Sequence, residues 1–401
     1  MRYRSMRPIF LLLFVASTTL AQKAGIQFKS TPVEAVFQEA RRSGKPVFVE
    51  VFSPTCHTCQ SFIPTFADAR VGKFYNSKFI STKVDIAQPA TQAFLAKNRL
   101  FVPSLPLFLY FDPQQNLVHF AMSSNSTDEV IRHGTNALTP QARSQNMKAR
   151  YQQGERSANF LIDYAMFSRV TKDTVANIAA MNDYARQQSP ATFANQTNWL
   201  AMQKLVLDSE NPMFQYMLGN LDKYRKAYGA DQTEQVAENI LMSSLFSGRG
   251  AQFPIARIVQ IRQDLVKAGI DAKVAANRTL LPEVNAYFRA RQTAKAVERM
   301  DNQVNTNQLT VPEYLYIARL FNRSSSPDAI DAPTVAKWAG KALAMRPPAK
   351  EQSDLYYELA EAYRRGGRTA DAQKAAQKSM ELAQTTKLDT RRNIEQMGKL
   401  K

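Results

Sequence analysis

Cysteine is scarce in this chain: its 401 residues include two cysteines, three histidines and two tryptophans. Two cysteines cannot form the several disulfides that stabilise small exported domains. Two cysteines and three histidines also provide few ligands for a zinc site. Long apolar runs are missing after the first twenty residues, so we expect no later segment to cross a membrane. Acidic residues are also outnumbered, with 34 Asp and Glu against 52 Lys and Arg.

The resulting formal net charge of +18 raises the question of a nucleic-acid partner. The basic residues, however, alternate with acids along predicted helices, without a dense run and without interleaved aromatic residues. We therefore interpret them as solvated helix faces and expect no nucleic-acid partner. An affinity for acidic partners or for an anionic membrane surface stays open.

The first 21 residues have the pattern of a cleaved secretory signal. Arg2, Arg4 and Arg7 precede a short apolar stretch, residues 9–16, and small residues follow near Ala21. This stretch is much shorter than the roughly 20 residues that span a bilayer. We therefore expect residues 1–21 to be a signal peptide and the protein to be exported without a membrane anchor, into the periplasm if its source is a Gram-negative bacterium.

Residues 22–139 alternate between strand and helix patterns, which predicts an α/β domain with a mixed central sheet flanked by helices. An almost wholly apolar run at residues 47–52 is typical of a strand buried on both faces. Helices are predicted near residues 32–42, after the cysteines to about residue 68, and at 90–98 and 128–137. Further strands are predicted at residues 79–85, 107–111 and 117–120.

From residue 140 to residue 401 the strand patterns disappear, which predicts an all-α domain. Within it, residues 311–383 resemble two tetratricopeptide units, in which small residues let paired helices approach closely. The residues at the repeat offsets include Ala318, Phe321, Ala339, Ala342, Ala360, Tyr363, Gly367, Ala372 and Ala376. A generic helical bundle is the alternative.

The two cysteines stand together as Cys56-His57-Thr58-Cys59, directly after the predicted buried strand. This spacing places both sulfurs on one helical turn, where they can act as a dithiol/disulfide couple. A zinc site is disfavoured because His119 and His133 belong to the predicted hairpin and last helix, where we expect surface or edge positions. A merely structural disulfide is disfavoured because it would close too small a loop to stabilise the fold.

Three further residues give this region its resemblance to the thioredoxin superfamily. Pro64 lies five residues after Cys59, where thioredoxins carry the proline that kinks the active-site helix. Glu50 lies six residues before Cys56, where they carry a buried acid. Pro106 precedes the predicted hairpin at the position of the family's cis-proline. Pro103 competes for that role, but the distance from Pro106 to the hairpin turn favours Pro106.

The resemblance implies a role for each residue. Cys56 would begin the active-site helix, where helix dipole and backbone N–H groups favour its thiolate, and would be the nucleophile. Cys59 would be the resolving thiol, and Glu50 would relay its proton. A cis bond before Pro106 would leave the backbone of Ser104 and Leu105 free to pair with substrate.

The residue between the cysteines also bears on the redox chemistry. His57, when charged, would favour the thiolate and make the disulfide more oxidising. Thr55 stands where thioredoxins usually have tryptophan, and glutamate replaces the commoner aspartate at position 50. With these departures we still expect the same class of reaction, but we do not assign thioredoxin's own role to this chain.

The sequence thus predicts an exported thiol–disulfide oxidoreductase with a thioredoxin fold followed by a helical-repeat domain. The Cys56–Cys59 pair would need no dissociable cofactor and no metal. The expected partners are protein thiols and disulfides, an electron donor or acceptor, and a client bound by the helical domain. The alternative is an interaction scaffold, in which the helical repeats bind the client and the thioredoxin domain is a recognition module.

Overall fold

The computed structural model describes residues 25–324 and 329–400, and it divides into two compact units between Asn177 and Ile178. The predicted signal peptide, residues 1–21, lies outside the described residues. The predicted domain boundary at 139/140 differs from this division, because residues 140–177 pack with the sheet. The two units are described separately below.

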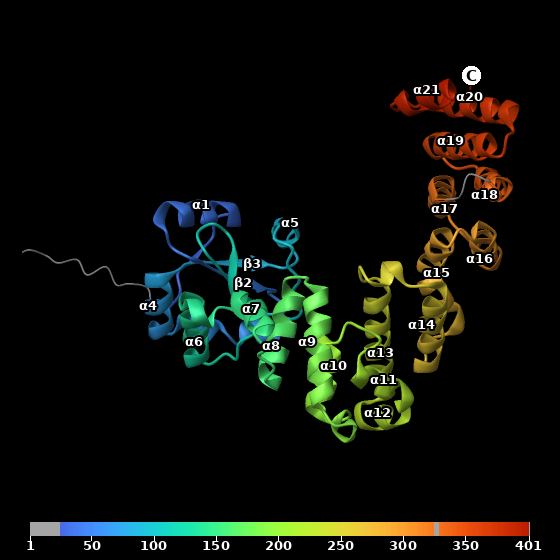
Figure 1. The fold of residues 1–401 in the computed structure, drawn as a ribbon. Coiled ribbons are helices and arrows are strands. Elements are labelled where there is room, and N and C mark those ends of the chain that lie inside the picture. The colour runs from blue at the N-terminus through green and yellow to red at the C-terminus, as the bar shows by residue number, and fades with distance from the viewer. Residues whose placement is uncertain (1–24, 325–328, 401) are drawn as a thin grey trace, which may run out of the picture. The chain divides into compact units, whose positions relative to one another are not determined.

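A five-stranded sheet is the centre of the first unit (Figure 1). Its order is β1-β3-β2-β4-β5, with β3 parallel to β1 and β2, and with β4 antiparallel to both β2 and β5. The mixed sheet predicted from the sequence is therefore present. It also contains the two-residue strand β1, which was not predicted. The strands are β1 (Phe28–Lys29), β2 (Val47–Phe52), β3 (Ile80–Asp85), β4 (Leu107–Phe111) and β5 (Leu117–Ala121).

Aromatic side chains attach helices to both faces of this sheet. On one face Phe37 of α1 packs against Phe94 of α5 and Phe111 of β4. On the other face the Tyr75 hydroxyl of α4 lies 2.8 Å from that of Tyr110 and donates to a carbonyl of α6. The helices are α1 (Val33–Ser43), α2 (His57–Gln60), α3 (Ile63–Ala67), α4 (Ala69–Lys78), α5 (Pro89–Lys97) and α6 (Thr127–Leu138).

Residues 140–177 cover the edge strand β5. The Ser144 backbone N–H donates to Nδ1 of His119 at 3.2 Å, and the rings of Phe120 and Phe167 lie 5.7 Å apart. The backbone N–H of Phe101 donates to a carbonyl at the end of α8. This extension consists of η1 (Pro140–Ala142), η2 (Ser144–Asn146), α7 (Met147–Gln152), α8 (Ala158–Val170) and the start of α9 (Thr174–Gln187).

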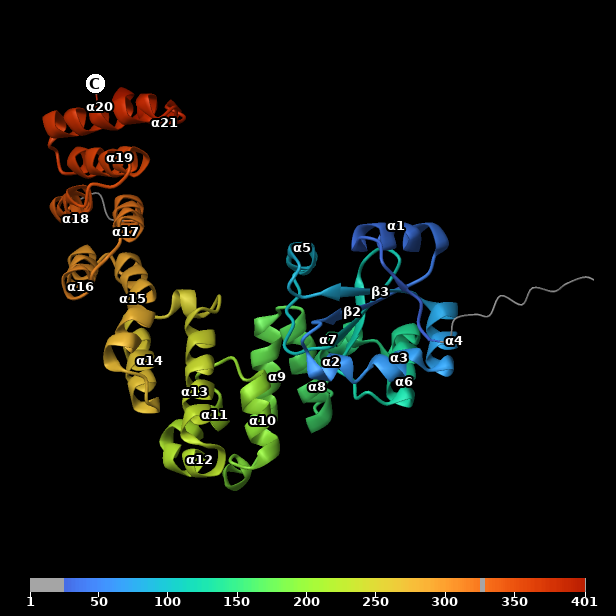
Figure 2. The same cartoon turned by 180° about the vertical axis from the view of Figure 1, so that it is seen from behind.

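The second unit is built from helices that follow one another as neighbouring pairs (Figure 2). They are α10 (Gln196–Leu205), α11 (Pro212–Gly219), α12 (Leu221–Tyr228), α13 (Ala230–Leu245), α14 (Ile255–Ala268), α15 (Ala272–Arg289), α16 (Thr293–Thr306), α17 (Val311–Ser324), α18 (Ala332–Ala344), α19 (Ala349–Arg365), α20 (Thr369–Thr385) and α21 (Arg391–Gly398). Short helical turns η3 (Pro190–Thr192) and η4 (Gly250–Gln252) connect some of them.

The two predicted tetratricopeptide-like units correspond to α17–α18 and α19–α20. Ala318, Ala342, Ala360 and Ala372 are fully buried, which fits the close approach of paired helices.

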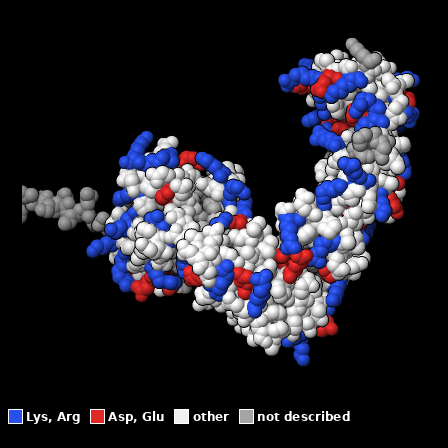
Figure 3. Space-filling view, in the orientation of Figure 1, with Lys and Arg blue, Asp and Glu red and all other residues white. Residues whose placement is uncertain are grey.

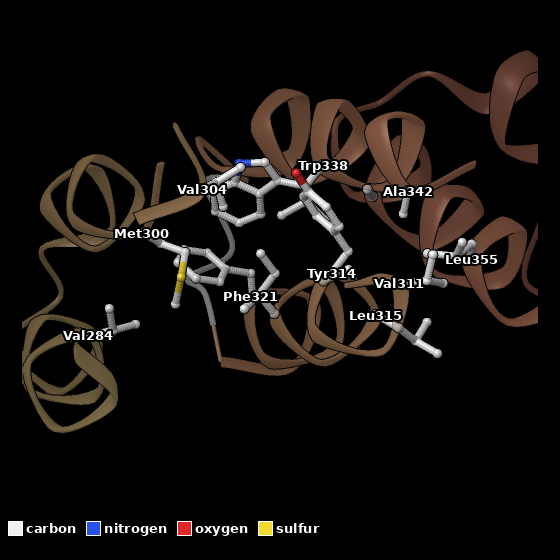
Figure 4. Close-up of a cluster of buried hydrophobic side chains, with 14 of the residues drawn as sticks. Val284, Met300, Val304, Val311, Tyr314, Leu315, Phe321, Trp338, Ala342 and Leu355 are labelled. Carbon is white, nitrogen blue, oxygen red and sulfur yellow. The ribbon is translucent and has the colours of Figure 1, made fainter. Parts of the chain in front are cut away.

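A large apolar cluster joins the helices from α15 to α19 (Figure 4). Trp338 is fully buried at its centre, with its ring 4.9 Å from that of Phe321 in an edge-on arrangement. Its indole N–H donates to Asp301 at 2.8 Å, so the polar end of the tryptophan is satisfied.

Charged residues are spread over the face drawn in Figure 3, where Lys and Arg are interspersed with Asp and Glu on both units. Within residues 25–324 and 329–400, no helix combines the length and apolarity that a membrane crossing requires.

Candidate active site

The cysteine pair lies where β2 ends and α2 begins. Cys56 is the N-cap residue of α2, and its Sγ accepts a hydrogen bond from the backbone N–H of Cys59 at 3.1 Å. Both cysteines are free thiols. Cys56 is half-buried, whereas Cys59 is 6% exposed, so Cys56 presents the more accessible sulfur.

The buried position of Cys59 determines its protonation. Burial, together with the hydrogen bond to Cys56 and the nearby charge of Glu50, raises the pKa of Cys59 to about 11. Cys59 is therefore a thiol at neutral pH. An incoming group meets Cys56 first, and Cys59 must lose a proton before it can attack.

Glu50 lies in the middle of β2 and is 1% exposed. Burial raises the pKa of its carboxyl group, and the neighbouring charge of Lys83 opposes this shift. Lys83 is the register partner of Glu50 on β3, and its Nζ lies 2.8 Å from Oε2 of Glu50. The carboxyl group is thus a buried ionisable group close enough to Cys59 to raise the pKa of that thiol.

Aromatic rings surround the ammonium group of Lys83. Its Nζ lies 4.4 Å from the ring centre of Phe28 and 4.6 Å from that of Phe66, distances typical of cation–π contacts. Sequence reasoning did not identify Lys83 as part of the site. The sequence does place a lysine in the predicted strand 79–85. Its pairing with Glu50, however, depends on the register between two strands, which the sequence alone does not give.

The loop before β4 lies opposite the cysteines. The peptide bond between Leu105 and Pro106 is cis, and no cis bond precedes Pro103. The carbonyl oxygen of Leu105 accepts from the Cys56 thiol at 3.9 Å. Ser104 is exposed, and its hydroxyl donates to Sδ of Met122, a residue that sequence reasoning also did not select. The structure therefore brings the predicted substrate-pairing backbone next to Cys56.

The two remaining predicted residues lie on the surface of the same region. His57 is exposed at the first position of α2. Pro64 is exposed and is the second residue of α3. The single helix predicted from the cysteines to about residue 68 is instead divided into α2 and α3, since a proline near the start of a helix cannot donate a backbone hydrogen bond to the preceding turn.

Of the surface or edge positions expected for the other two histidines, the edge position is found for His119, which lies on the edge strand β5, but neither histidine is exposed. His119 is 6% exposed and the His133 side chain is 15% exposed, because residues 140–177 cover this edge of the sheet. Within the two described ranges, no three or more His, Cys, Asp or Glu side chains gather as metal ligands.

Comparisons with known proteins agree with the geometry of the sheet. Residues 29–113, which contain both cysteines and Pro106, match a family model described as thioredoxin-like. The sheet domain therefore belongs to the thioredoxin superfamily. Among solved structures, a disulphide isomerase from Xylella fastidiosa Temecula1 matches with 12% identity and a TM-score of 0.21, over 29% of this chain and 90% of that one. No curated protein matches the chain.

Proposed function

We propose that the protein is an exported thiol–disulfide oxidoreductase that exchanges disulfides with protein substrates of the cell envelope through Cys56 and Cys59. The observation that carries this proposal is the asymmetry of the pair. The sulfur of Cys56 is accessible and receives a backbone N–H, whereas Cys59 is buried with a pKa of about 11.

The exchange proceeds through two sulfur transfers. In the reducing direction the Cys56 thiolate attacks one sulfur of a substrate disulfide, which forms a mixed disulfide and releases the other substrate sulfur as a thiolate that takes up a proton. Cys59 then loses its proton and attacks Cys56. The substrate leaves with two thiols, and the protein holds the Cys56–Cys59 disulfide. The oxidising direction is the reverse.

Glu50 is the proposed acceptor of the Cys59 proton. Its carboxyl group is buried beside that thiol, and a raised pKa lets it exchange protons closer to neutral pH than an exposed glutamate does. Ser104 and Leu105 are the proposed backbone contacts of an extended substrate segment, and His57 is the proposed tuner of the redox potential. The dithiol needs no dissociable cofactor or metal, but each cycle needs an external electron donor or acceptor.

Paired cysteine variants test this function. Replacing Cys59 with serine should let Cys56 form a mixed disulfide that cannot be resolved, so a disulfide-containing protein such as insulin becomes covalently attached. The Cys56→Ser variant is the matched control and should attach none. Attachment through Cys59 instead of Cys56, or no reduction of insulin by the wild-type dithiol, would contradict the proposal. Export is tested by the N-terminal mass of the mature protein, expected to begin after Ala21.

A further inference from the structure

Arg169 is a positively charged side chain beside the loop before β4. It is half-buried near the end of α8, in the extension that covers β5. Across residues 25–324 and 329–400, no Asp or Glu forms an ion pair with it. Burial lowers the pKa of its guanidinium group, but the group stays charged because the ordinary pKa of arginine is far above neutral. No described acid therefore compensates the charge of Arg169.

Phe101 holds Arg169 in place. The guanidinium carbon lies 5.2 Å from the ring centre of Phe101, a distance typical of cation–π contacts. The backbone N–H of Phe101 donates to the carbonyl oxygen of Val170 at 2.8 Å, so the end of α8 and the loop are joined at this point. A guanidinium group over an aromatic ring keeps the N–H donors along its edge, where they can bind a carboxylate through two parallel hydrogen bonds.

Phe101 lies close enough to the cysteines for one bound peptide to reach both. It is 39% exposed, and four residue steps along the chain separate it from Leu105, whose carbonyl oxygen accepts from the Cys56 thiol. Four steps of extended chain span at most about 14 Å. A substrate segment that pairs with the backbone of Ser104 and Leu105 covers the same distance in about four residues.

Three further cations lie within a few residues of the joined segments. Lys97 ends α5, Arg99 lies at the start of the loop before β4, and Lys172 follows the end of α8; all three are exposed. None of them pairs with a carboxylate in the part of the chain that the structure describes. Together they give the approach to Arg169 a positive field, which attracts acidic polypeptides. Because these cations adjoin the loop that faces Cys56, a substrate polypeptide fits them better than a membrane surface.

We propose that Arg169, held over Phe101, binds a carboxylate group of the substrate polypeptide within about four or five residues of the disulfide under exchange. This inference rests on the proposed function and names the substrate feature that the protein selects: an aspartate or glutamate close to the reacting cysteine. Arg169 lies outside the family match at residues 29–113, so this selectivity is a property that the extension adds to the matched segment.

Two peptide disulfides test the inference in the full-length protein. They are identical except that one carries glutamates on both sides of the reacting cysteine, about three to five residues away, and the other carries glutamines there. The wild type should reduce the glutamate peptide with a kcat/KM about tenfold higher, as expected for one charge-assisted hydrogen bond. In the Arg169→Gln variant this ratio should fall toward one, with little change in the rate for the glutamine peptide.

The Arg42→Gln variant is the matched control. Arg42 is exposed on the last turn of α1, before β2 begins, whereas Cys56 follows the other end of that strand. This variant removes the same charge away from the loop, so it should keep the full ratio. Arg169→Lys keeps the charge but not the planar fork of the guanidinium group, so its ratio should lie between those of the wild type and Arg169→Gln. If Arg42→Gln lowers the ratio as much as Arg169→Gln does, net charge alone matters and the inference is overturned.

A binding measurement separates this inference from the proposed function. A cysteine-free version of the glutamate peptide should bind the wild type and Arg42→Gln about tenfold more tightly than Arg169→Gln, as measured by fluorescence anisotropy. Equal kcat/KM values of the wild type for both disulfide peptides would overturn the inference and leave the function intact. Binding to phosphatidylglycerol vesicles that depends on Arg169, without any preference between the peptides, would also overturn it by assigning the cations to a membrane. Binding of the glutamate peptide without reduction of either disulfide peptide would instead overturn the function.

Discussion

The two units of the molecule bury ionisable side chains in different ways. In the helical unit, Glu283 is 3% exposed and one of its carboxylate oxygens accepts from both Arg262 and Arg299, at 2.6 and 2.8 Å. In the sheet unit, Glu50 is equally buried but has a single cation, Lys83, and its pKa is raised. Two arginines thus bind the buried carboxyl group of Glu283, whereas Glu50 pairs with one lysine and burial raises its pKa.

Other residues limit this contrast to particular sites. Asp331 of the helical unit is held by Arg365, whereas burial raises the pKa of Glu358 of the same unit although it contacts Arg319. His119 of the sheet unit is buried with the uncharged Ser144 as its hydrogen-bond partner, and burial lowers its pKa to about 3. Arginines thus hold Glu283 and Asp331, whereas burial dominates the pKa shifts of Glu50, Glu358 and His119.

The largest effect is expected from removing Glu283. The Glu283→Ala variant leaves Arg262 and Arg299 without their shared partner, which should lower the free energy of unfolding of the helical unit by about 3 kcal/mol. Urea unfolding followed by circular dichroism measures this. Glu283→Gln, which keeps a hydrogen-bond acceptor, should lose less. Equal stability of Glu283→Ala and the wild type would break the comparison.

The next effect concerns acid. Because the folded pKa of His119 is depressed to about 3 against 6.5 in the unfolded chain, the unfolded state binds the additional proton between these values. The sheet unit should therefore lose stability as pH falls below 6.5, with a slope near 1.4 kcal/mol per pH unit from this group. Thermal unfolding of wild type and His119→Gln compares the slopes, and the variant should have the shallower one.

A smaller effect is expected at Glu50. The Glu50→Gln variant cannot accept the Cys59 proton, so resolution of the mixed disulfide should slow by about tenfold, within the range of general-base contributions. Because the pKa of Glu50 is raised in the folded state, its ionisation costs stability as pH rises above 4.5, and this variant should lack that loss. Stopped-flow reduction of a small disulfide gives the rate. Glu283→Gln serves as the control, with an unchanged rate.

The smallest effect is expected from Lys83→Met. This variant keeps an apolar side chain among the rings of Phe28 and Phe66 and removes the charge that opposes the raised pKa of Glu50. The pH at which the resolution rate reaches half of its maximum should rise, while the rate on the high-pH plateau changes by less than about tenfold. An unshifted pH profile would show that Lys83 does not tune the proton acceptor.

Local patterns predicted most of the sheet unit. The apolar run at residues 47–52 forms β2, as predicted, and the residues around Asp112 form the predicted turn between β4 and β5. The cysteine spacing, Glu50 and Pro106 could be selected because their distances along the chain are short and fixed. The resemblance placed a kink of the helix at Pro64, but the complete interruption between α2 and α3 was not predicted. Lys83 could not be selected, since its role depends on pairing with a strand more than thirty residues away.

What the sequence by itself determined was the cysteine pair, the residues selected around it and the alternation of strands and helices, because these depend on spacing and on side-chain polarity. The tertiary structure alone decided which groups are buried together. Residues 140–177 have no motif of their own, yet by packing against β5 they cover His119 and line a cavity beside that strand. Burial of this kind is a long-range property, because it depends on what covers a residue and not on what precedes or follows it.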